Sequence, residues 1–248
     1  MAHGSDDAGR VRPVDAAGLV LIRDGSHGPE VLLGRRHRRV AFLPDIYVFP
    51  GGRVDPEDAR PSGFAERFAP GLEPQLAKSC TRRPPAAFPR AALRETFEET
   101  GLLLGRPAAQ APGAGTHVGP WRHFAERGLA PAFDALDLVC RAITPAASRR
   151  RYNTRFFLAD GGAAQGQLSG DGELEDLRWF PIPETARLGL VDVTQVVLAE
   201  ALRRWRRRTP AGTPAPLLSY RGDVVCLRRP GHGILIGEAA VLGAAALE

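Results

Sequence analysis

The sequence is poor in cysteine and in long apolar runs, and each shortage excludes a class of protein. Its three cysteines, Cys80, Cys140 and Cys226, are widely spaced and form no CxxC pattern, so they favour reduced structural thiols over a disulfide framework or a zinc site. No apolar run approaches the roughly 18 to 20 residues that span a bilayer, and the opening MAHGSDDAGRVRP lacks the apolar stretch of a signal peptide. We therefore expect a cytoplasmic protein without a membrane segment.

Lysine is also nearly absent, so arginine carries almost all of the positive charge. The formal net charge is +5, and Lys78 is the sole lysine. Two arginine-rich runs, RRHRR at 35–39 and RRWRRR at 203–208, indicate an anionic partner. The runs are not interleaved with the aromatic residues that stacking on nucleic-acid bases requires. We therefore disfavour nucleic acid and expect a small phosphorylated substrate.

Several common catalytic signatures are missing as well. The sequence contains no GxSxG of a serine hydrolase and no GxxxxGK[ST] phosphate loop, and its six histidines show no HxxxH-type metal spacing. The stretch GAGTHVG is too loose to serve as a dinucleotide-binding fingerprint. The chemistry must therefore come from other residues.

The pattern of apolar runs predicts a single domain of mixed α/β (α+β) class. With 248 residues, 44% of them hydrophobic, the chain has the size and composition of one globular domain. Short apolar runs predict strands, the first two of them a hairpin, at 16–23, 30–36, 136–143, 154–159 and 174–182, with two more around RRPGHG near the C-terminus. YVFPGG at 47–52 predicts a short strand that Pro50 stops, followed by a flexible loop at the two glycines. Helices are predicted from Pro89 to Gly101 and over 193–208.

The ends of the chain and one internal stretch differ in composition from the rest. We expect residues 1–12 to form a flexible tail and 13–240 to form the domain, with an inserted segment at about 56–88, where Pro, Gly, Arg and Ala dominate. The closing AAALE resembles a vector-derived linker, so residues 241–248 are predicted to be a tail of partly foreign origin.

The stretch RETFEETG at 94–101 gathers three glutamates on one predicted helix. At about 100° per residue, Glu95, Glu98 and Glu99 fall within about a quarter-turn of the helix surface, and we expect all three carboxylates to face outward. The opposite side carries residues suited to burial, namely Leu93, Phe97 and Thr100. One interpretation is a solvated acidic face, and the other is a metal site.

Charge favours the metal site. No basic residue follows any of the three glutamates at the i+4 position, so these like charges repel by a few tenths of a kcal/mol per pair. A divalent cation removes that repulsion, and Mg²⁺ prefers carboxylate oxygens while sharing its other positions with water and substrate phosphates. Arg94, four residues before Glu98, can hold that carboxylate in place.

Together with the upstream VFPGG, this helix resembles the signature of the Nudix hydrolases. That signature is a glycine, five residues, a glutamate, seven residues, then R-E-U-x-E-E-x-G-U, where U is bulky and apolar. RETFEETGL fits the second half, with Thr96 departing at the first U. In the first half, Ala86 stands where the glutamate is expected, and Gly51 and Gly52 lie some forty residues upstream. The box therefore looks split by the insert, and Asp55 is our candidate for its acid.

Three segments narrow the resemblance to one subgroup. FLPDIYVFPGGRVDPED, AALRETFEETGLLL and NTRFFLA are similar to segments of the peroxisomal coenzyme A diphosphatases of the Nudix type and their bacterial relatives. LLGRR at 32–36 partly matches the coenzyme A signature of that subgroup. The resemblance implies a Nudix-type α/β/α sandwich with a mixed sheet, an insert in the box and extra C-terminal strands.

The resemblance also implies metal-dependent hydrolysis of a pyrophosphate. Its cofactor would be Mg²⁺ or Mn²⁺, held by Glu95, Glu98, Glu99 and the Gly51 carbonyl. Glu98 is the first candidate for the general base and Glu95 the second, with Arg94 as a further catalytic residue. Glu173 and Glu175, from an acidic stretch that is otherwise an exposed loop, are alternative bases. Phosphate contacts are expected from Arg35, Arg36, Gly51 and Gly52.

The implied substrate is a nucleoside diphosphate linked to another moiety, most simply coenzyme A or acyl-coenzyme A. ADP-ribose, a dinucleotide or a nucleotide sugar is the alternative within the same chemistry. A non-catalytic Nudix module that binds a nucleotide or RNA is the alternative from another class, and the intact set of three glutamates argues against it. Nudix enzymes are often homodimers, so a homodimer is also expected.

Overall fold

The computed structural model of the chain describes residues 11–40, 43–78, 82–108, 117–170 and 172–237. The predicted tails, apart from Val11 and Arg12, lie outside the described residues, as does Cys80. Cys140 and Cys226 are both buried free thiols. The division into tails, domain and insert stays a prediction, as does the homodimer.

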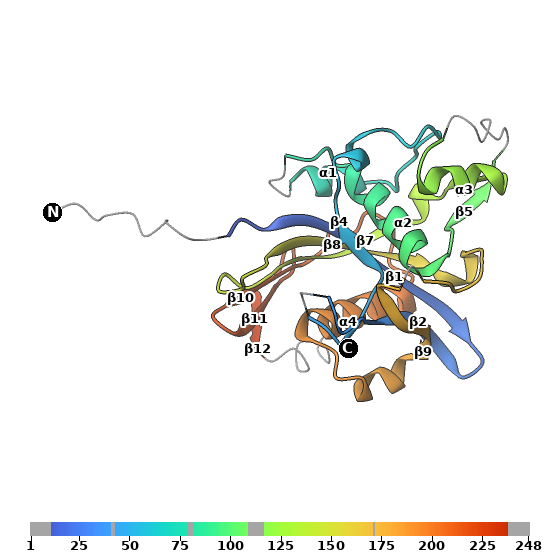
Figure 1. Cartoon of the computed structure of the whole chain (residues 1–248). Coiled ribbons are helices and arrows are strands. Elements are labelled where there is room, and N and C mark those ends of the chain that lie inside the picture. Colours follow the sequence, from blue (N-terminus) through green and yellow to red (C-terminus); the bar gives the residue numbers. More distant parts are fainter. Residues whose placement is uncertain (1–10, 41–42, 79–81, 109–116, 171, 238–248) are drawn as a thin grey trace.

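A ten-stranded mixed sheet forms the centre of the molecule (Figure 1). Its strands run in the order β12-β11-β10-β7-β8-β1-β2-β3, with β4 paired to β1 and β9 paired to β2. The β1–β8 and β7–β10 pairs are parallel and the other pairs are antiparallel. The strands are β1 (Val14–Gly25), β2 (Gly28–Arg36), β3 (Tyr47–Val48), β4 (Gly51–Arg53), β7 (Asp137–Ile143), β8 (Tyr152–Asp160), β9 (Leu174–Pro181), β10 (Leu217–Arg221), β11 (Val224–Arg228) and β12 (Ile234–Gly237).

Two long helices cover opposite faces of this sheet, α2 (Ala87–Thr100) on one and α4 (Asp192–Arg206) on the other (Figure 1). The α2 side also carries α1 (Leu72–Ala77), α3 (Pro120–Glu126) and a small sheet of β5 (Gly105–Pro107) and β6 (Leu129–Pro131). Short 3-10 turns are η1 (Glu57–Ala59), η3 (Phe133–Ala135), η4 (Gly161–Ala163) and η5 (Ile182–Arg187). The predicted α/β fold with a mixed sheet is confirmed. Within the described ranges, no helix is long and apolar enough to cross a membrane.

Strand β1 shows why the first apolar run has no polar alternation. Leu19 and Leu21 pack into the core under α2, whereas Val20 and Ile22 pack into the core under α4, and all four are fully buried. A strand covered on both faces is apolar at every position, and each such side chain contributes about 1.5–3 kcal/mol of burial free energy. Strand β1 is therefore a firm support for β4, which pairs with it through Gly51 and Gly52.

Most predicted elements are found close to their predicted positions, but Gly51 and Gly52, which we expected in a loop, belong to strand β4 and pair with β1. The first hairpin is β1–β2, and α2 ends where Gly101 adopts φ 72° and donates its N–H to the Phe97 carbonyl at 2.7 Å. The prediction of two C-terminal strands is wrong, because β10, β11 and β12 are three. A tight turn at Gly222, where φ is 58°, separates β10 from β11 inside the run that we interpreted as one strand.

The segment before α2 is fastened to that helix by buried ion pairs. Arg90 donates from Nε to Glu66 Oε1 at 2.8 Å and from Nη1 to the Asp58 carbonyl at 2.9 Å. Although burial works against its charge, the bonds from Arg90 and Ser62 lower the pKa of Glu66. The segment thus packs beside α2, on the same side of the sheet.

Candidate active site

The glycine pair of β4 lies directly against the acidic end of α2. The Gly51 N–H donates to Glu99 Oε2 at 2.7 Å. A Cβ on Gly51 would come within 3.0 Å of the Ala17 carbonyl oxygen, and one on Gly52 would come as close to Glu95 Oε1. Only glycine allows this approach of strand to helix. The VFPGG and RETFEETG motifs, far apart in sequence, therefore form one site.

The three glutamates of α2 do not share one environment. Glu99 is only 3% exposed and lies under the glycine pair, whereas the side chains of Glu95 and Glu98 are 16% and 41% exposed. The prediction that all three face outward is wrong for Glu99. Its turn inward follows from the hydrogen bond with Gly51, which replaces the water that this carboxylate gives up.

Arg94 organises the outer part of the site. Its Nη1 donates to Glu95 Oε1 at 2.9 Å and to Glu98 Oε2 at 2.8 Å, and its Nη2 donates to the Arg53 carbonyl at 2.9 Å. Although burial opposes its charge, the hydrogen bonds to Asp58 and the nearby carboxylates raise the pKa of Arg94. This guanidinium therefore fixes two of the three glutamates to the glycine strand.

The acid that anchors Arg94 is Asp58, which the sequence analysis missed. Asp58 accepts from Arg94 Nε at 3.0 Å through Oδ1 and from Nη2 at 2.9 Å through Oδ2. Asp55, our candidate, lies 3.9 Å from Nη2 with its side chain 55% exposed. The signal was present, because five residues separate Gly52 from Asp58, as in the first half of the Nudix signature. The additional chain therefore lies between Asp58 and Arg94.

Thr96 explains how a polar residue occupies an apolar position of the signature. Its side chain is buried, and its hydroxyl donates to the Ala92 carbonyl at 2.7 Å. A buried hydroxyl with a backbone partner carries little desolvation cost. The departure at Thr96 thus leaves the packing of α2 intact.

Burial shifts the protonation of both inner glutamates in the metal-free protein. Desolvation raises the pKa of Glu99 to about 8, against the stabilising Gly51 N–H and with added repulsion from Glu95 and Glu173. Desolvation likewise raises the pKa of Glu95 to about 7, against the charge of Arg94. Two buried carboxylates that disfavour each other's charge are suited to a shared cation.

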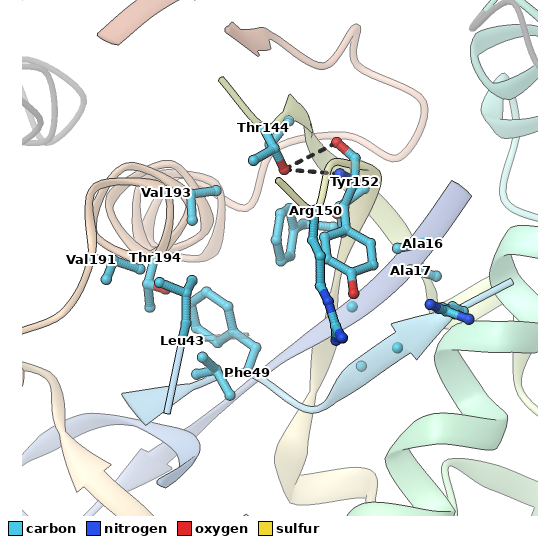
Figure 2. Close-up of a pocket in the computed structure, with 18 of the residues that line it drawn as sticks. Ala16, Ala17, Leu43, Phe49, Thr144, Arg150, Tyr152, Val191, Val193 and Thr194 are labelled. Carbon is cyan, nitrogen blue, oxygen red and sulfur yellow. Dashed lines mark hydrogen bonds between the residues drawn. The ribbon is translucent and has the colours of Figure 1, made fainter. Parts of the chain in front are cut away.

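A cavity of about 930 Å³ opens beside these carboxylates. One end is lined by the glycine pair, Glu95 and Glu99, and the other by apolar side chains around the start of α4, including Leu43, Phe49, Val191 and Val193. Figure 2 shows Leu43, Phe49 and the α4 residues on one side of the cavity, with Ala16 and Ala17 on the other. The cavity can therefore hold a ligand that is polar at one end and apolar at the other.

The predicted site residues divide into those that line this cavity and those that do not. Lining it are Arg36, Gly51, Gly52, Glu95, Glu99 and Glu173. Glu98 instead borders a separate surface hollow of about 530 Å³ together with Phe97 and His123. Arg35 is paired with Asp45 at 3.3 Å and Glu175 at 3.4 Å, away from the cavity. The roles assigned to these residues stay predictions.

The donor set fits a hard divalent cation by its chemistry, since Glu95 and Glu99 present carboxylate oxygens beside the backbone of Gly51 and Gly52. No three His, Cys, Asp or Glu side chains in the described part of the chain are already arranged around a metal position. Glu95 is held by Arg94, so its carboxylate would have to turn from that guanidinium to share an ion with Glu99.

The chain is similar to a solved Nudix hydrolase structure over most of its length. No model of a known protein family matches the chain. The crystal structure of a Nudix hydrolase from Alicyclobacillus acidocaldarius is 30% identical, with a TM-score of 0.55 and coverage of 77% of this chain and 92% of that one.

Two curated relatives carry the name acyl-coenzyme A diphosphatase NUDT19. The Gallus gallus protein is 28% identical over 240 residues and 71% of this chain, and the Homo sapiens protein is 30% identical over 181 residues and 54% of this chain. The chain spans only 63% and 48% of the lengths of these two relatives.

Proposed function

The chain belongs to the Nudix hydrolase superfamily, as its likeness to the Alicyclobacillus enzyme shows, and on that premise we propose that it hydrolyses the pyrophosphate of coenzyme A or acyl-coenzyme A. The predicted Nudix membership is confirmed, with distant homology to the acyl-coenzyme A diphosphatases. The substrate is the part that we propose.

The observation that carries this proposal is the two-ended cavity. Coenzyme A joins a phosphorylated adenosine through a pyrophosphate to a long pantetheine arm, and the acyl forms add an apolar chain. A substrate of this kind needs a site for phosphates next to the carboxylates and a roomy apolar wall beyond them, which is how the 930 Å³ cavity is lined. The names of the two curated relatives support the same substrate.

The metal ion in this proposal is Mg²⁺ or Mn²⁺, with Glu95 and Glu99 as its inner ligands and Glu98 and the Gly51 carbonyl as the others predicted. When bound, such an ion neutralises the phosphate oxygens and lowers the pKa of a coordinated water. The protein's own part is to orient these ligands. Arg94 holds Glu95 and Glu98, and the Gly51 N–H holds Glu99.

In the reaction, water attacks one phosphorus of the pyrophosphate and the bond from that phosphorus to the bridging oxygen breaks. The products are 3′,5′-ADP and a 4′-phosphopantetheine, acylated when the substrate is. The base that takes the proton from water is proposed among Glu98, Glu95 and Glu173. Glu173 gains support from its place on the cavity wall, whereas Glu175 is paired with Arg35.

A hydrolysis panel tests this function. The wild-type protein is incubated with Mg²⁺ or Mn²⁺ and coenzyme A, an acyl-coenzyme A, ADP-ribose, a diadenosine polyphosphate or a nucleotide sugar, and the products are separated by chromatography. We expect the highest kcat/KM on the coenzyme A compounds. Good turnover of ADP-ribose without turnover of coenzyme A compounds would overturn the substrate assignment.

A pair of variants shows whether the turnover belongs to this site. Glu99→Gln removes a charge that the cation needs, so kcat/KM should fall roughly a hundredfold or more. Glu73→Gln, an exposed substitution at the start of α1, is the matched control and should keep the wild-type rate. Tight nucleotide binding with no turnover of any compound by the wild type would favour the non-catalytic module instead.

A further inference from the structure

One wall of the cavity is formed by the connection between β7 and β8, which carries Arg150. Thr144, Ser148 and Arg150 of this connection line the cavity, as does Tyr152 at the start of β8. Figure 2 shows the Arg150 side chain extending beside the Tyr152 ring into the cavity. Arg150 is one of three successive arginines, and nothing in the sequence distinguishes it from Arg149 or predicts a role for it.

The backbone on both sides of Arg150 is fixed. The Thr144 hydroxyl accepts the Tyr152 N–H at 2.9 Å, and the Thr144 N–H donates to the Tyr152 carbonyl at 3.0 Å. Arg151 donates from Nη1 to the Val11 carbonyl at 3.0 Å, and its own carbonyl accepts the Val14 N–H at 2.8 Å. The direction in which Arg150 leaves the backbone is therefore set before any ligand binds, which lowers the entropy cost of binding one.

Arg150 differs from Arg94 and Arg35 in that it has no acidic partner among the residues that the structure describes. Arg94 is bound by Asp58, Glu95 and Glu98, and Arg35 by Asp45 and Glu175. Arg150 makes no hydrogen bond or ion pair with any residue that the structure describes. An uncommitted guanidinium that points into a cavity is suited to bidentate binding of a phosphate.

We propose that Arg150 is a phosphate-binding residue of the substrate site. The proposal rests on the proposed function in that the substrate is a phosphoanhydride. A coenzyme A substrate offers two phosphate sources, the pyrophosphate that is cleaved and the separate 3′-phosphate on the ribose. Arg150 reaches in from a wall that carries no glutamate, so it holds the substrate and takes no part in moving protons.

The competing explanation is that Arg150 is an ordinary solvated arginine, and Arg149 provides the matched control. Arg149 is the neighbouring residue, is likewise exposed and does not line the cavity. Arg149→Gln and Arg150→Gln therefore remove the same charge from the same connection. A general effect of net charge on substrate attraction would be the same in both variants.

The experiment compares kcat and KM of the wild type, Arg149→Gln, Arg150→Gln and Arg150→Lys on coenzyme A, 3′-dephospho-coenzyme A and ADP-ribose. We expect Arg150→Gln to raise KM roughly tenfold to a hundredfold, the usual loss of a hydrogen bond to a charged group. Arg150→Lys should show a smaller rise in KM, because lysine keeps the positive charge but lacks the two parallel N–H donors of the guanidinium. The thermal midpoint of each variant should match the wild type.

The substrate series assigns the phosphate. A loss confined to coenzyme A places the 3′-phosphate at Arg150, whereas an equal loss on all three substrates places the pyrophosphate there. Equal kinetics of Arg150→Gln and Arg149→Gln on every substrate would overturn the proposal. Failure of the proposed function has a separate signature, absent turnover of coenzyme A compounds by the wild type, and the Arg150 comparison is then made with ADP-ribose.

Discussion

The ion pair between Asp58 and Arg94 gives the sharpest test of how the split signature is joined. We expect Asp58→Asn to lower both stability and activity. Oδ1 of Asp58 accepts Arg94 Nε, and Oδ2 accepts both Arg94 Nη2 and the Asp55 N–H. In the Asp58→Asn variant, one of these acceptors becomes an NH₂ group that faces another donor, and the charge opposite Arg94 is lost.

The size of the effect follows from burial. The Asp58 side chain is 2% exposed and that of Arg94 is 12% exposed, so water does little to replace the lost bonds. Breaking a buried pair completely costs about 3–5 kcal/mol, but Arg94 keeps Glu95 and Glu98 as partners. We therefore expect a loss of about 2–3 kcal/mol in the free energy of unfolding. For a chain of this length that lowers the melting temperature by roughly 4–12 °C.

Urea and thermal unfolding measure this loss, and Asp55→Asn is the control. Asp55 is more than half exposed and 3.9 Å from Arg94, so its substitution should cost less than about 0.5 kcal/mol. The kcat of Asp58→Asn should also fall, because Arg94 no longer has a fixed base from which to orient the glutamates. Equal stability of the two variants would refute the assignment of Asp58 as the anchoring acid.

Three further predictions concern the metal site. Gly52→Ala should lower kcat/KM about tenfold or more, because the added Cβ would clash with the Glu95 carboxylate. The control is Gly233→Ala, whose Cβ would meet nothing within 4 Å and should leave kcat/KM unchanged. Steady-state kinetics with Mn²⁺ titration would check both variants. Mg²⁺ affinity should rise from pH 6 to pH 9, because burial raises the pKa of Glu95 to about 7 and of Glu99 to about 8, and calorimetry in buffers of different ionisation enthalpy should detect proton release on binding. From pH 4.5, the ordinary pKa of a glutamate, up to the raised pKa values of about 7 and 8, Glu95 and Glu99 stay protonated in the folded metal-free protein but are ionised in the unfolded chain. The free energy of unfolding of the metal-free protein should therefore fall as the pH rises through this range. Affinity that falls with rising pH would contradict this account.

Local patterns carried most of the fold prediction. The β1–β2 hairpin and the α2 helix depend on contacts between near neighbours in sequence, and Gly101 marks the helix end by its own backbone conformation. The prediction of the C-terminal strands was wrong for a local reason too. The turn at Gly222 has only two residues between β10 and β11, so the apolar pattern on its two sides reads as one strand.

Only the site residues that share a single secondary-structure element could be placed together from the sequence. RETFEETG places Glu95, Glu98 and Glu99 on a single helix, so their neighbourhood follows from helical geometry. The burial of Glu99 depends on β4, whose Gly51 donates to its carboxylate. The position of β4 depends in turn on its pairing with β1 and on the parallel pairing of β1 with β8. The wall with Arg150 comes from yet another connection, and no spacing rule in the sequence links it to α2.

The way in which the chain leaves and rejoins the signature bears on how such a protein can change over evolution. Between Asp58 and Arg94 the chain departs and returns to nearly the same point, where Arg94 binds the Asp58 carboxylate and Arg90 its carbonyl. The entropy of closing a loop grows only with the logarithm of its length. Once these two arginines clamp the ends, the stretch between them can gain or lose residues at little cost to the geometry beside the glycines. Asp58 thus marks a position after which insertions are tolerated, so that descendants of one ancestral enzyme can acquire new surface while the glutamates keep their positions.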